Sequence, residues 1–180
     1  MAVRGRSTVN AVAFAQFVDY RSRALLRTAY LLVGDHGLAQ DLLQEALTKT
    51  YVAWGRLRDP ANAEAYARQV LVTTAISWRR RRSFHESPRA EVPEDPRPDS
   101  PHGIAERDAV WRELQALPAR QRAAIVLRFY EDLTDAQAAE VMGCAAGTVS
   151  SQVSQGLRRL RERAGTGVSL LGQTETEGSR

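Results

Sequence analysis

Four consecutive arginines follow a serine and a tryptophan in the stretch SWRRRR, which comprises Ser77, Trp78, Arg79, Arg80, Arg81 and Arg82. Guanidinium groups stay charged and pair with phosphate oxygens, and an aromatic ring can stack on a planar base. These residue types in succession therefore predict contact with a polyanion. The plainer alternative is a solvated polar cap at the end of a helix, and Trp78 suits core packing as well as it suits base contact.

A second group of polar residues lies in LTDAQAAEVMGCAAGTVSSQVSQGLRRLRER, residues 133–163. Small residues at 138 and 139 and a glycine at 143 are typical of a helix-turn-helix, in which Val141, Met142, Val149 and Val153 would fill the space between the helices. The second helix would turn hydrogen-bonding side chains toward base edges and phosphates, at Thr148, Ser150, Ser151, Gln152, Ser154 and Gln155. Its arginines would add phosphate contacts, at Arg158, Arg159, Arg161 and Arg163. An ordinary helical hairpin with a solvated surface is the alternative.

A third group is acidic. In AQDLLQEALTKTYVAW, Asp41, Gln44 and Glu45 stand at helical i, i+3 and i+4 spacing, on one side of a predicted helix. An acidic, amide-bearing surface in an otherwise basic segment suits docking of another protein. The alternative is an ordinary polar helix face.

The sequence argues against catalysis. His36, His85 and His102 fall in predicted loops or linker, no glycine-rich phosphate loop is present, and no acid–base pair has a plausible scaffold. The one cysteine, Cys144, forms neither an internal disulfide nor a cysteine-built metal site, and we expect it to pack in a turn. We therefore expect a protein that is not an enzyme and has no cofactor and no metal site.

The net charge of +4 is unevenly distributed. Residues 1–82 carry 13 Lys and Arg against 6 Asp and Glu, a net of +7, whereas residues 83–103 carry 2 against 5, a net of −3. The basic segment predicts a polyanion partner. No stretch reaches the roughly 18 to 20 apolar residues that cross a membrane, and the N-terminus lacks the apolar segment of a signal peptide. We expect a cytoplasmic protein that has no membrane partner.

Five of the seven prolines lie in SPRAEVPEDPRPDSP, residues 87–101. Proline fixes φ and removes a backbone donor, so this stretch predicts an extended linker at 83–103. The linker separates a module at 10–82 from a second module at 104–165. We expect frayed ends at 1–8 and a disordered tail at 166–180.

Both modules read as helical, which predicts an all-α fold of two small domains. Apolar residues recur at steps of three and four from Phe14 to Leu32, and GDHG at 34–37 ends that helix, with Asp35 as the cap of the next. A third helix is predicted from about Ala63 to Arg82. The second module predicts helices at 104–115 and 118–130, then a short helix capped by Thr134 or Asp135, and a long one from about Ala146.

Taken together, these segments resemble the extracytoplasmic-function (group IV) sigma factors of the sigma-70 type, in particular their actinobacterial SigE-like branch. DLLQEALTKTYVAWGRL at 41–57 is similar to the family's segment that binds the β′ clamp helices of RNA polymerase. AYARQVLVTTAISWRRRR at 65–82 is similar to its −10 helix, and LPARQRAAIVLRFYEDLTDAQAAEVMGCAAGTVSSQVSQGLRRLRE at 117–162 to its −35 domain.

The resemblance implies a dissociable specificity subunit, whose partners are promoter DNA and core RNA polymerase, including the β′ clamp helices and the β subunit. It implies core binding by Asp41, Leu42, Leu43, Gln44 and Glu45. It implies −10 contacts by Asn62, Tyr66, Arg68, Thr73, Thr74, Ser77, Trp78, Arg79, Arg80, Arg81 and Arg82. It implies −35 contacts by Thr148, Ser150, Ser151, Gln152, Gln155, Arg158 and Arg159. It leaves open whether an anti-sigma protein binds the chain.

A linker of about 21 residues at roughly 3.3–3.6 Å each reaches about 70 Å, or about two turns of B-DNA at roughly 34 Å per turn. The sequence departs from the family at Ser150, Gln152 and Gln155, where members usually carry Lys or Arg, and at Thr73, where asparagine is frequent. Each missing cation removes a phosphate or guanine contact. The alternative function is a stand-alone helix-turn-helix regulator, with residues 10–82 as a dimerisation or sensor module.

Overall fold

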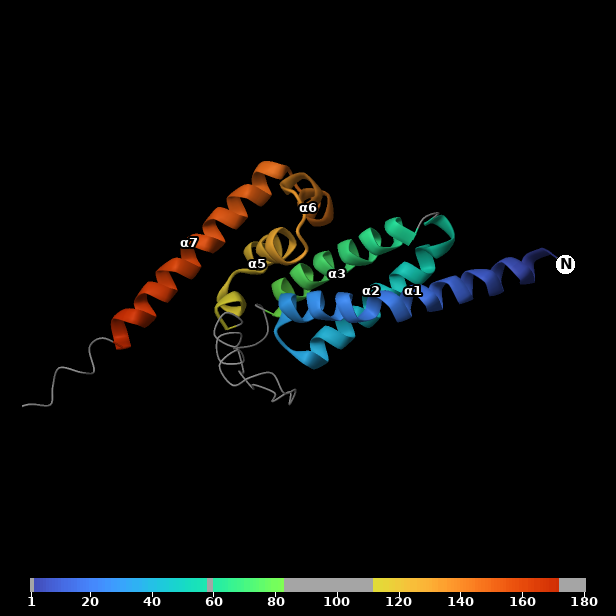
Figure 1. The fold of residues 1–180 in the computed structure, drawn as a ribbon, viewed down its shortest axis with the longest axis horizontal. Helices are drawn as coiled ribbons and strands as arrows, with labels where there is room; N and C mark the ends of the chain where they lie inside the picture. The colour runs from blue at the N-terminus through green and yellow to red at the C-terminus, as the bar shows by residue number, and fades with distance from the viewer. Residues whose placement is uncertain (1, 58–59, 83–111, 172–180) are drawn as a thin grey trace, which may run out of the picture.

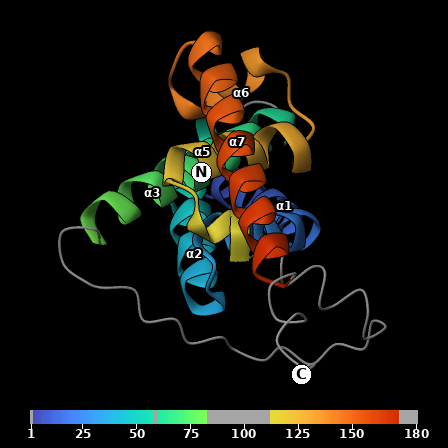
Figure 2. The ribbon, with the colours of Figure 1, turned by 90° about the vertical axis from the view of Figure 1, so that its left-hand side faces the viewer.

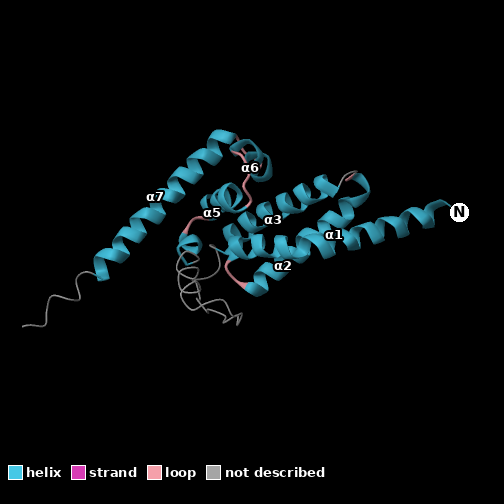
Figure 3. Ribbon diagram, viewed as in Figure 1, coloured by secondary structure: helices cyan, strands magenta, loops and turns pink. Residues whose placement is uncertain are grey.

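The computed structural model describes residues 2–57, 60–82 and 112–171, with side chains at 11–57, 62–78 and 112–164. Within these ranges every regular element is a helix and there is no strand (Figure 3). The predicted all-α class is therefore confirmed. The predicted linker at 83–103, the predicted helix start at Ile104, and His85 and His102 lie outside the described residues.

Three helices form the N-terminal part: α1 (Ala2–Val33), α2 (His36–Ala53) and α3 (Pro60–Arg82). A short 3₁₀ turn, Trp54–Arg56, follows α2. The helices lie side by side (Figure 1) because each carries an apolar stripe at helical spacing, and all three stripes enter one core. On α2 this stripe consists of Ala39, Leu42, Leu43, Ala46, Leu47, Thr50 and Ala53.

The turn between α1 and α2 follows the predicted chemistry. Gly34 has φ +80°, a left-handed conformation that a residue with a Cβ rarely adopts. Asp35 then caps α2, and its Oδ1 accepts a hydrogen bond of 2.7 Å from the backbone N–H of Leu38. At the N-terminus the expectation of a frayed segment at 1–8 is wrong, because α1 begins at Ala2.

Aromatic side chains close the other end of the α1–α2 hairpin. The ring of Phe14 lies 5.1 Å from that of Trp54 in an edge-to-face arrangement and 4.9 Å from that of Tyr51. Phe17 adds a contact with Trp54 at 5.3 Å. Such pairs add about 0.5–1.5 kcal/mol each beyond their burial, so they hold the two helices in register.

The C-terminal part begins with a helical segment at residues 112–116. It continues with α5 (Ala119–Ile125), a π-helical turn (Val126–Tyr130), α6 (Asp135–Met142) and α7 (Ala146–Leu171). The single helix predicted at 118–130 is thus α5 followed by the wider turn, with Pro118 as its N-cap. The expectation of a disordered tail from 166 is wrong as far as Leu171, where α7 ends.

The two parts pack against each other. Helices α5 and α6 lie on α3, and α7 projects away from the three-helix bundle (Figures 1 and 2). One hydrophobic cluster runs through both parts, from Leu71 and Ala75 of α3 to Ala123 of α5 and Ala138 of α6. The structure is therefore a closed arrangement in which the C-terminal helices cover one side of α3.

Candidate nucleic-acid interface

Helices α6 and α7 form the predicted helix-turn-helix. Thr134 and Gln137 cap α6 reciprocally: Thr134 Oγ1 accepts from the Gln137 N–H at 3.2 Å, and Gln137 Oε1 accepts from the Thr134 N–H at 2.9 Å. Gly143 ends the helix with φ 63° and ψ 45°, a left-handed conformation. Local chemistry therefore fixes both ends of α6, and α7 begins at the predicted Ala146.

The residues predicted to fill the space between these helices do so. Val141, Met142 and Val149 are buried, and Val153 packs against the same cluster. Cys144 also packs there, as a partly buried turn residue.

The inner face of α7 crosses α5 at close range. A Cβ at Gly156 would lie 2.7 Å from Ile125 Cδ1, so glycine allows this approach. The opposite face is exposed at Ser150, Ser151 and Ser154, while Thr148, Gln152 and Gln155 are half-buried. The arrangement leaves a row of hydroxyl and amide groups on the outer side of the helix, which is the geometry that base reading requires.

Gln155 and Arg159 are not free on that face. Gln155 Oε1 accepts from Gln121 Nε2 at 3.1 Å, and Gln155 Nε2 donates to Ser151 Oγ at 3.1 Å. Arg159 Nη1 donates to Gln121 Oε1 at 3.0 Å. Gln121 belongs to α5 and is 4% exposed, so a buried amide links two of the predicted −35 residues to the scaffold.

The remaining arginines of α7 are exposed. Arg158 lies 3.7 Å from Glu162, and both side chains are open to water, so this ion pair contributes little stability. Arg163 pairs with Glu113 at 2.5 Å, and the hydrogen bond and charge of that carboxylate raise the pKa of Arg163. Arg158 therefore remains available for phosphate contacts at little cost.

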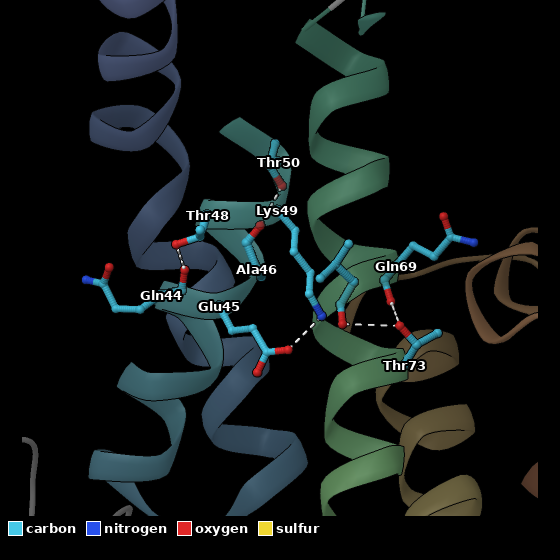
Figure 4. Close-up of polar contacts among 9 residues, drawn as sticks. Gln44, Glu45, Ala46, Thr48, Lys49, Thr50, Gln69 and Thr73 are labelled. Atoms are coloured by element: carbon cyan, nitrogen blue, oxygen red, sulfur yellow. Dashed lines mark hydrogen bonds and ion pairs between the residues drawn. The ribbon is translucent and has the colours of Figure 1, made fainter. Parts of the chain in front are cut away.

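On α3, the predicted −10 residues differ in exposure. Asn62 and Thr73 are exposed. Thr73 Oγ1 donates to the carbonyls of Gln69 and Val70, at 2.8 and 3.2 Å (Figure 4). Tyr66, Ser77 and Trp78 are half-buried, and both aromatic rings pack against the core.

The predicted −10 residues also include Thr74 and the four arginines at the end of α3. Thr74 is 7% exposed, so its side chain is buried in the closed arrangement, and its contact with −10 DNA stays a prediction. The side chains of Arg79, Arg80, Arg81 and Arg82 lie outside the described residues, although the backbone of α3 remains helical through them.

Arg68, another predicted −10 residue, is held by two carboxylates. Its Nη2 donates to Glu64 Oε1 at 3.0 Å, and its Nε lies 2.9 Å from Glu131 Oε2. Within the described part of the chain the Nε–H meets no acceptor at a hydrogen-bonding angle, so the Glu131 contact is an ion pair by distance alone. Glu64 also pairs with Arg21 of α1 at 2.9 Å.

The acidic face of α2 is exposed at Asp41 and Gln44. Glu45 is half-buried and pairs with Lys49 at 2.6 Å on the side of α2 nearer α3, while Gln44 points to the opposite side (Figure 4). Leu42 and Leu43 are 0% and 7% exposed. Their assignment to a docking surface is wrong, because both side chains fill the bundle core.

Sequence reasoning missed the contacts that join the two parts. Arg122 of α5 is 0% exposed and donates to the carbonyl of Leu32 at the end of α1, at 2.7 Å. It also donates to the carbonyls of Leu114, Gln115 and Leu117 at 2.7–2.9 Å. Glu131, at the end of the π-helical turn, accepts a hydrogen bond from Thr28 of α1. The one sequence signal was an arginine directly before the apolar run 123–127.

Comparison with known proteins agrees with this geometry. Residues 17–85 match the family described as Sigma-70 region 2, and residues 107–160 match Sigma-70 region 4. The RNA polymerase sigma-E factor of Streptomyces coelicolor is 40% identical over 83% of this chain and 84% of its own length. The ECF RNA polymerase sigma factor SigL of Mycobacterium tuberculosis is 30% identical over 88% of this chain and 93% of its own.

The chain belongs to the extracytoplasmic-function sigma factors. A solved relative is the sigma factor RpoE of Bartonella quintana, in complex with the anti-sigma factor NepR. It superposes with a TM-score of 0.65 at 28% identity, over 83% of this chain and 95% of that one. The region 2 match favours this family over a stand-alone regulator, because it covers the module that such a regulator would use for dimerisation or sensing.

As a sigma factor, this protein binds core RNA polymerase and directs promoter-specific initiation through −10 and −35 recognition. Sigma factors are non-catalytic initiation factors. Among the described residues there is no cluster of three or more potential metal ligands, and no helix is both long and apolar enough to span a bilayer.

Proposed function

We propose that α7 of this sigma factor enters the major groove of the −35 element. The observation that carries the proposal is the exposed polar face that begins behind the left-handed turn at Gly143 and is backed by α5. In this proposal the base edges are read by Thr148, Ser150, Ser151 and Gln152, with Gln155 behind them. The phosphates are bound by Arg158 and by the N–H groups of Arg159 that do not donate to Gln121. Because Ser and Gln replace the family's cations, phosphate attraction contributes less here and hydrogen bonding contributes more.

We propose that the −10 element binds along α3. Asn62 and Thr73 supply exposed polar contacts, and Tyr66, Ser77 and Trp78 flank the melted strand. Arg79–Arg82 supply phosphate attraction at the end of the helix, where the helix dipole also favours cations. Base capture costs a few kcal/mol per base, and aromatic stacking returns roughly 1–3 kcal/mol per base.

We propose that Asp41 and Gln44 of α2, with the flank of Glu45, dock on the β′ clamp helices, and that the C-terminal module contacts the β subunit. The modules are 10–82 and 104–165, and the segment 83–103 tethers them across the promoter. Since α5 and α6 cover α3 in the closed arrangement, the modules separate when they bind both promoter elements. The protein acts in the cytoplasm, where its polymerase is.

An anti-sigma partner is part of this proposal, because the Bartonella relative was solved with an anti-sigma factor bound. Such a partner would hold the modules in an arrangement that denies α3 to DNA. Affinity capture of this chain from its own cells, with and without added core polymerase, tests for a partner that core polymerase displaces.

The central experiment is run-off transcription with core polymerase, this protein and a genomic promoter library. Promoter-specific transcripts are expected, and their absence across the library would overturn the assignment. Asp41→Arg with Gln44→Ala should reduce co-purification with core polymerase. Asp19→Arg, which reverses an exposed charge on α1, serves as the control. Equal core binding by both variants would show that α2 is not the docking surface.

A further inference from the structure

Four side chains form a continuous hydrogen-bond chain from α5 to the outer face of α7. Arg159 Nη1 donates to Gln121 Oε1 at 3.0 Å, Gln121 Nε2 donates to Gln155 Oε1, and Gln155 Nε2 donates to Ser151 Oγ, the last two both at 3.1 Å. Gln121, on which the chain turns, is 4% exposed. The chain therefore connects a buried amide with an exposed hydroxyl.

Arg159 sets the direction of every bond in this chain. A guanidinium group has only donors, so Gln121 must present its oxygen to Arg159 and its NH₂ group to Gln155. Gln155 must then accept with its oxygen, which leaves its NH₂ group to face Ser151. Rotating either amide by 180° would place two NH₂ groups or two oxygens in contact.

Ser151 therefore receives a hydrogen bond from inside the protein. The Ser151 O–H itself donates to no other group within the described part of the protein. Because Ser151 is exposed, the hydroxyl proton is free to point outward. Ser151 is thus biased to donate to, rather than accept from, whatever meets this face.

The same chain changes the role of Gln155. A glutamine that reads adenine needs its oxygen and its NH₂ group together on the base edge. In Gln155 the oxygen is already bound by Gln121. Gln152 follows Ser151 in sequence and lies outside this hydrogen-bond chain. Its oxygen and its NH₂ group make none of these bonds, so it is the glutamine suited to adenine.

We propose that Gln121 and Gln155 are positioning residues that fix Ser151 as an outward donor, and that Ser151 selects an acceptor-bearing base in the −35 element. Guanine (N7 and O6) and thymine (O4) present acceptors in the major groove, whereas cytosine presents the N4 amino donor. Ser151 then favours guanine or thymine over cytosine at the base it faces. The inference rests on the proposed entry of α7 into the −35 groove.

The substitution Gln155→Glu tests the polarity. A carboxylate at 155 still accepts from Gln121 but has no N–H for Ser151, so the Ser151 hydroxyl donates inward and presents lone pairs outward. The preference at that base should invert toward cytosine. Ala146→Glu adds the same charge at an exposed position of the same helix, outside the hydrogen-bond chain and outside the base-reading residues, so it is the control for repulsion by DNA phosphates.

The measurement uses the full-length protein assembled with core polymerase and a promoter pool with a randomised −35 element. Bound promoters are sequenced, so each base preference is an internal ratio that does not depend on total activity. The wild type should favour guanine or thymine over cytosine about fivefold at one position, the size expected for one neutral hydrogen bond. Ser151→Ala should flatten that position, and Gln155→Glu should invert it.

Three results would contradict the inference. If Gln155→Glu leaves the base preference at that position as Ala146→Glu does, the hydrogen-bond chain does not set the polarity of Ser151. If Ser151→Ala lowers binding evenly for all sequences, Ser151 contacts phosphate and selects no base. If neither substitution on α7 changes any −35 position, the proposed docking of α7 itself fails, and that outcome is distinct from the first two.

Discussion

Arg68 of α3 and Glu131, at the end of the π-helical turn, lie 2.9 Å apart between Nε and Oε2 and join the two halves of the protein. Their side chains are only 17% and 14% exposed. The family resemblance implies that Arg68 contacts −10 DNA, so Glu131 would occupy a cation that the promoter uses. The closed arrangement and −10 binding by Arg68 are therefore mutually exclusive.

Glu131→Gln should favour opening. Glutamine keeps an acceptor for Thr28 but removes the charge that pairs with Arg68, a loss of about 1–2 kcal/mol or roughly 5- to 30-fold in the closed–open equilibrium. Affinity of the free protein for a single-stranded −10 oligonucleotide should rise by that factor, because apparent affinity scales with the competent fraction. Fluorescence anisotropy measures it. Glu140→Gln, at an exposed position of α6, is the control. An equal rise in oligonucleotide affinity for both variants would show that Glu131 does not compete with DNA for Arg68.

Arg122 is predicted to be the main polar residue stabilising the closed structure. It is fully buried and satisfies backbone carbonyls at the end of α1 and ahead of α5. Arg122→Met keeps the volume but leaves those acceptors unpaired, so we expect a loss of about 3–5 kcal/mol in the free energy of unfolding. Arg120→Met, at an exposed position on the same helix, should stay within about 0.5 kcal/mol. Urea denaturation followed by circular dichroism distinguishes them, and equal losses would assign the effect to helix propensity.

The parts of the fold that local chemistry determines were predictable. The cap at Asp35, the capping Thr134, the turn at Gly143 and the start of α7 at Ala146 follow from residues within four positions of each other in sequence. The three-residue and four-residue apolar spacing likewise predicted which faces of the helices are buried. Type and order of the described helices therefore followed from the sequence, whereas α1 and α7 extend past the ends predicted for them.

What the sequence could not supply is which polar residues are already engaged. Thr74 and Leu42 occupy positions that match the family's functional segments, yet both side chains are buried. Gln155 and Arg159 stand on α7, yet Gln121, more than thirty positions earlier, binds both. These contacts depend on how separate helices pack. A sequence pattern within one helix contains no information on its distance from another helix.

Gly156 is predicted to set the closeness of α7 to α5. A Cβ there would lie 2.7 Å from Ile125 Cδ1 and 3.5 Å from Gln121 Cβ. Gly156→Val should overpack this crossing and cost about 1–3 kcal/mol. Gly147→Val adds the same side chain to α7 where nothing lies within 4 Å, and it should change the free energy of unfolding by less than about 0.5 kcal/mol. Chemical denaturation measures both variants. If Gly156→Val leaves the free energy of unfolding unchanged, the Ile125 side chain moves aside without cost.

The arginine run is predicted to act on DNA and not on core polymerase. Replacing Arg79–Arg82 with glutamines removes up to four phosphate contacts at the end of α3. Each lost contact should lower the slope of log affinity against log salt by about 0.7 for a single strand and about 0.9 for a duplex. Open-complex formation, followed by permanganate reactivity of the melted bases at several salt concentrations, should therefore fall and become less salt-dependent.

The control for that experiment removes positive charge elsewhere on the same module. Arg23→Gln with Arg27→Gln alters two exposed positions of α1 and should leave the salt slope of open-complex formation unchanged. Core polymerase affinity should be the same for the wild type and both variants. If the four-glutamine variant instead lost core binding, the end of α3 would belong to the docking surface. The proposed assignment of α2 to the polymerase and α3 to the promoter would then have to be redrawn.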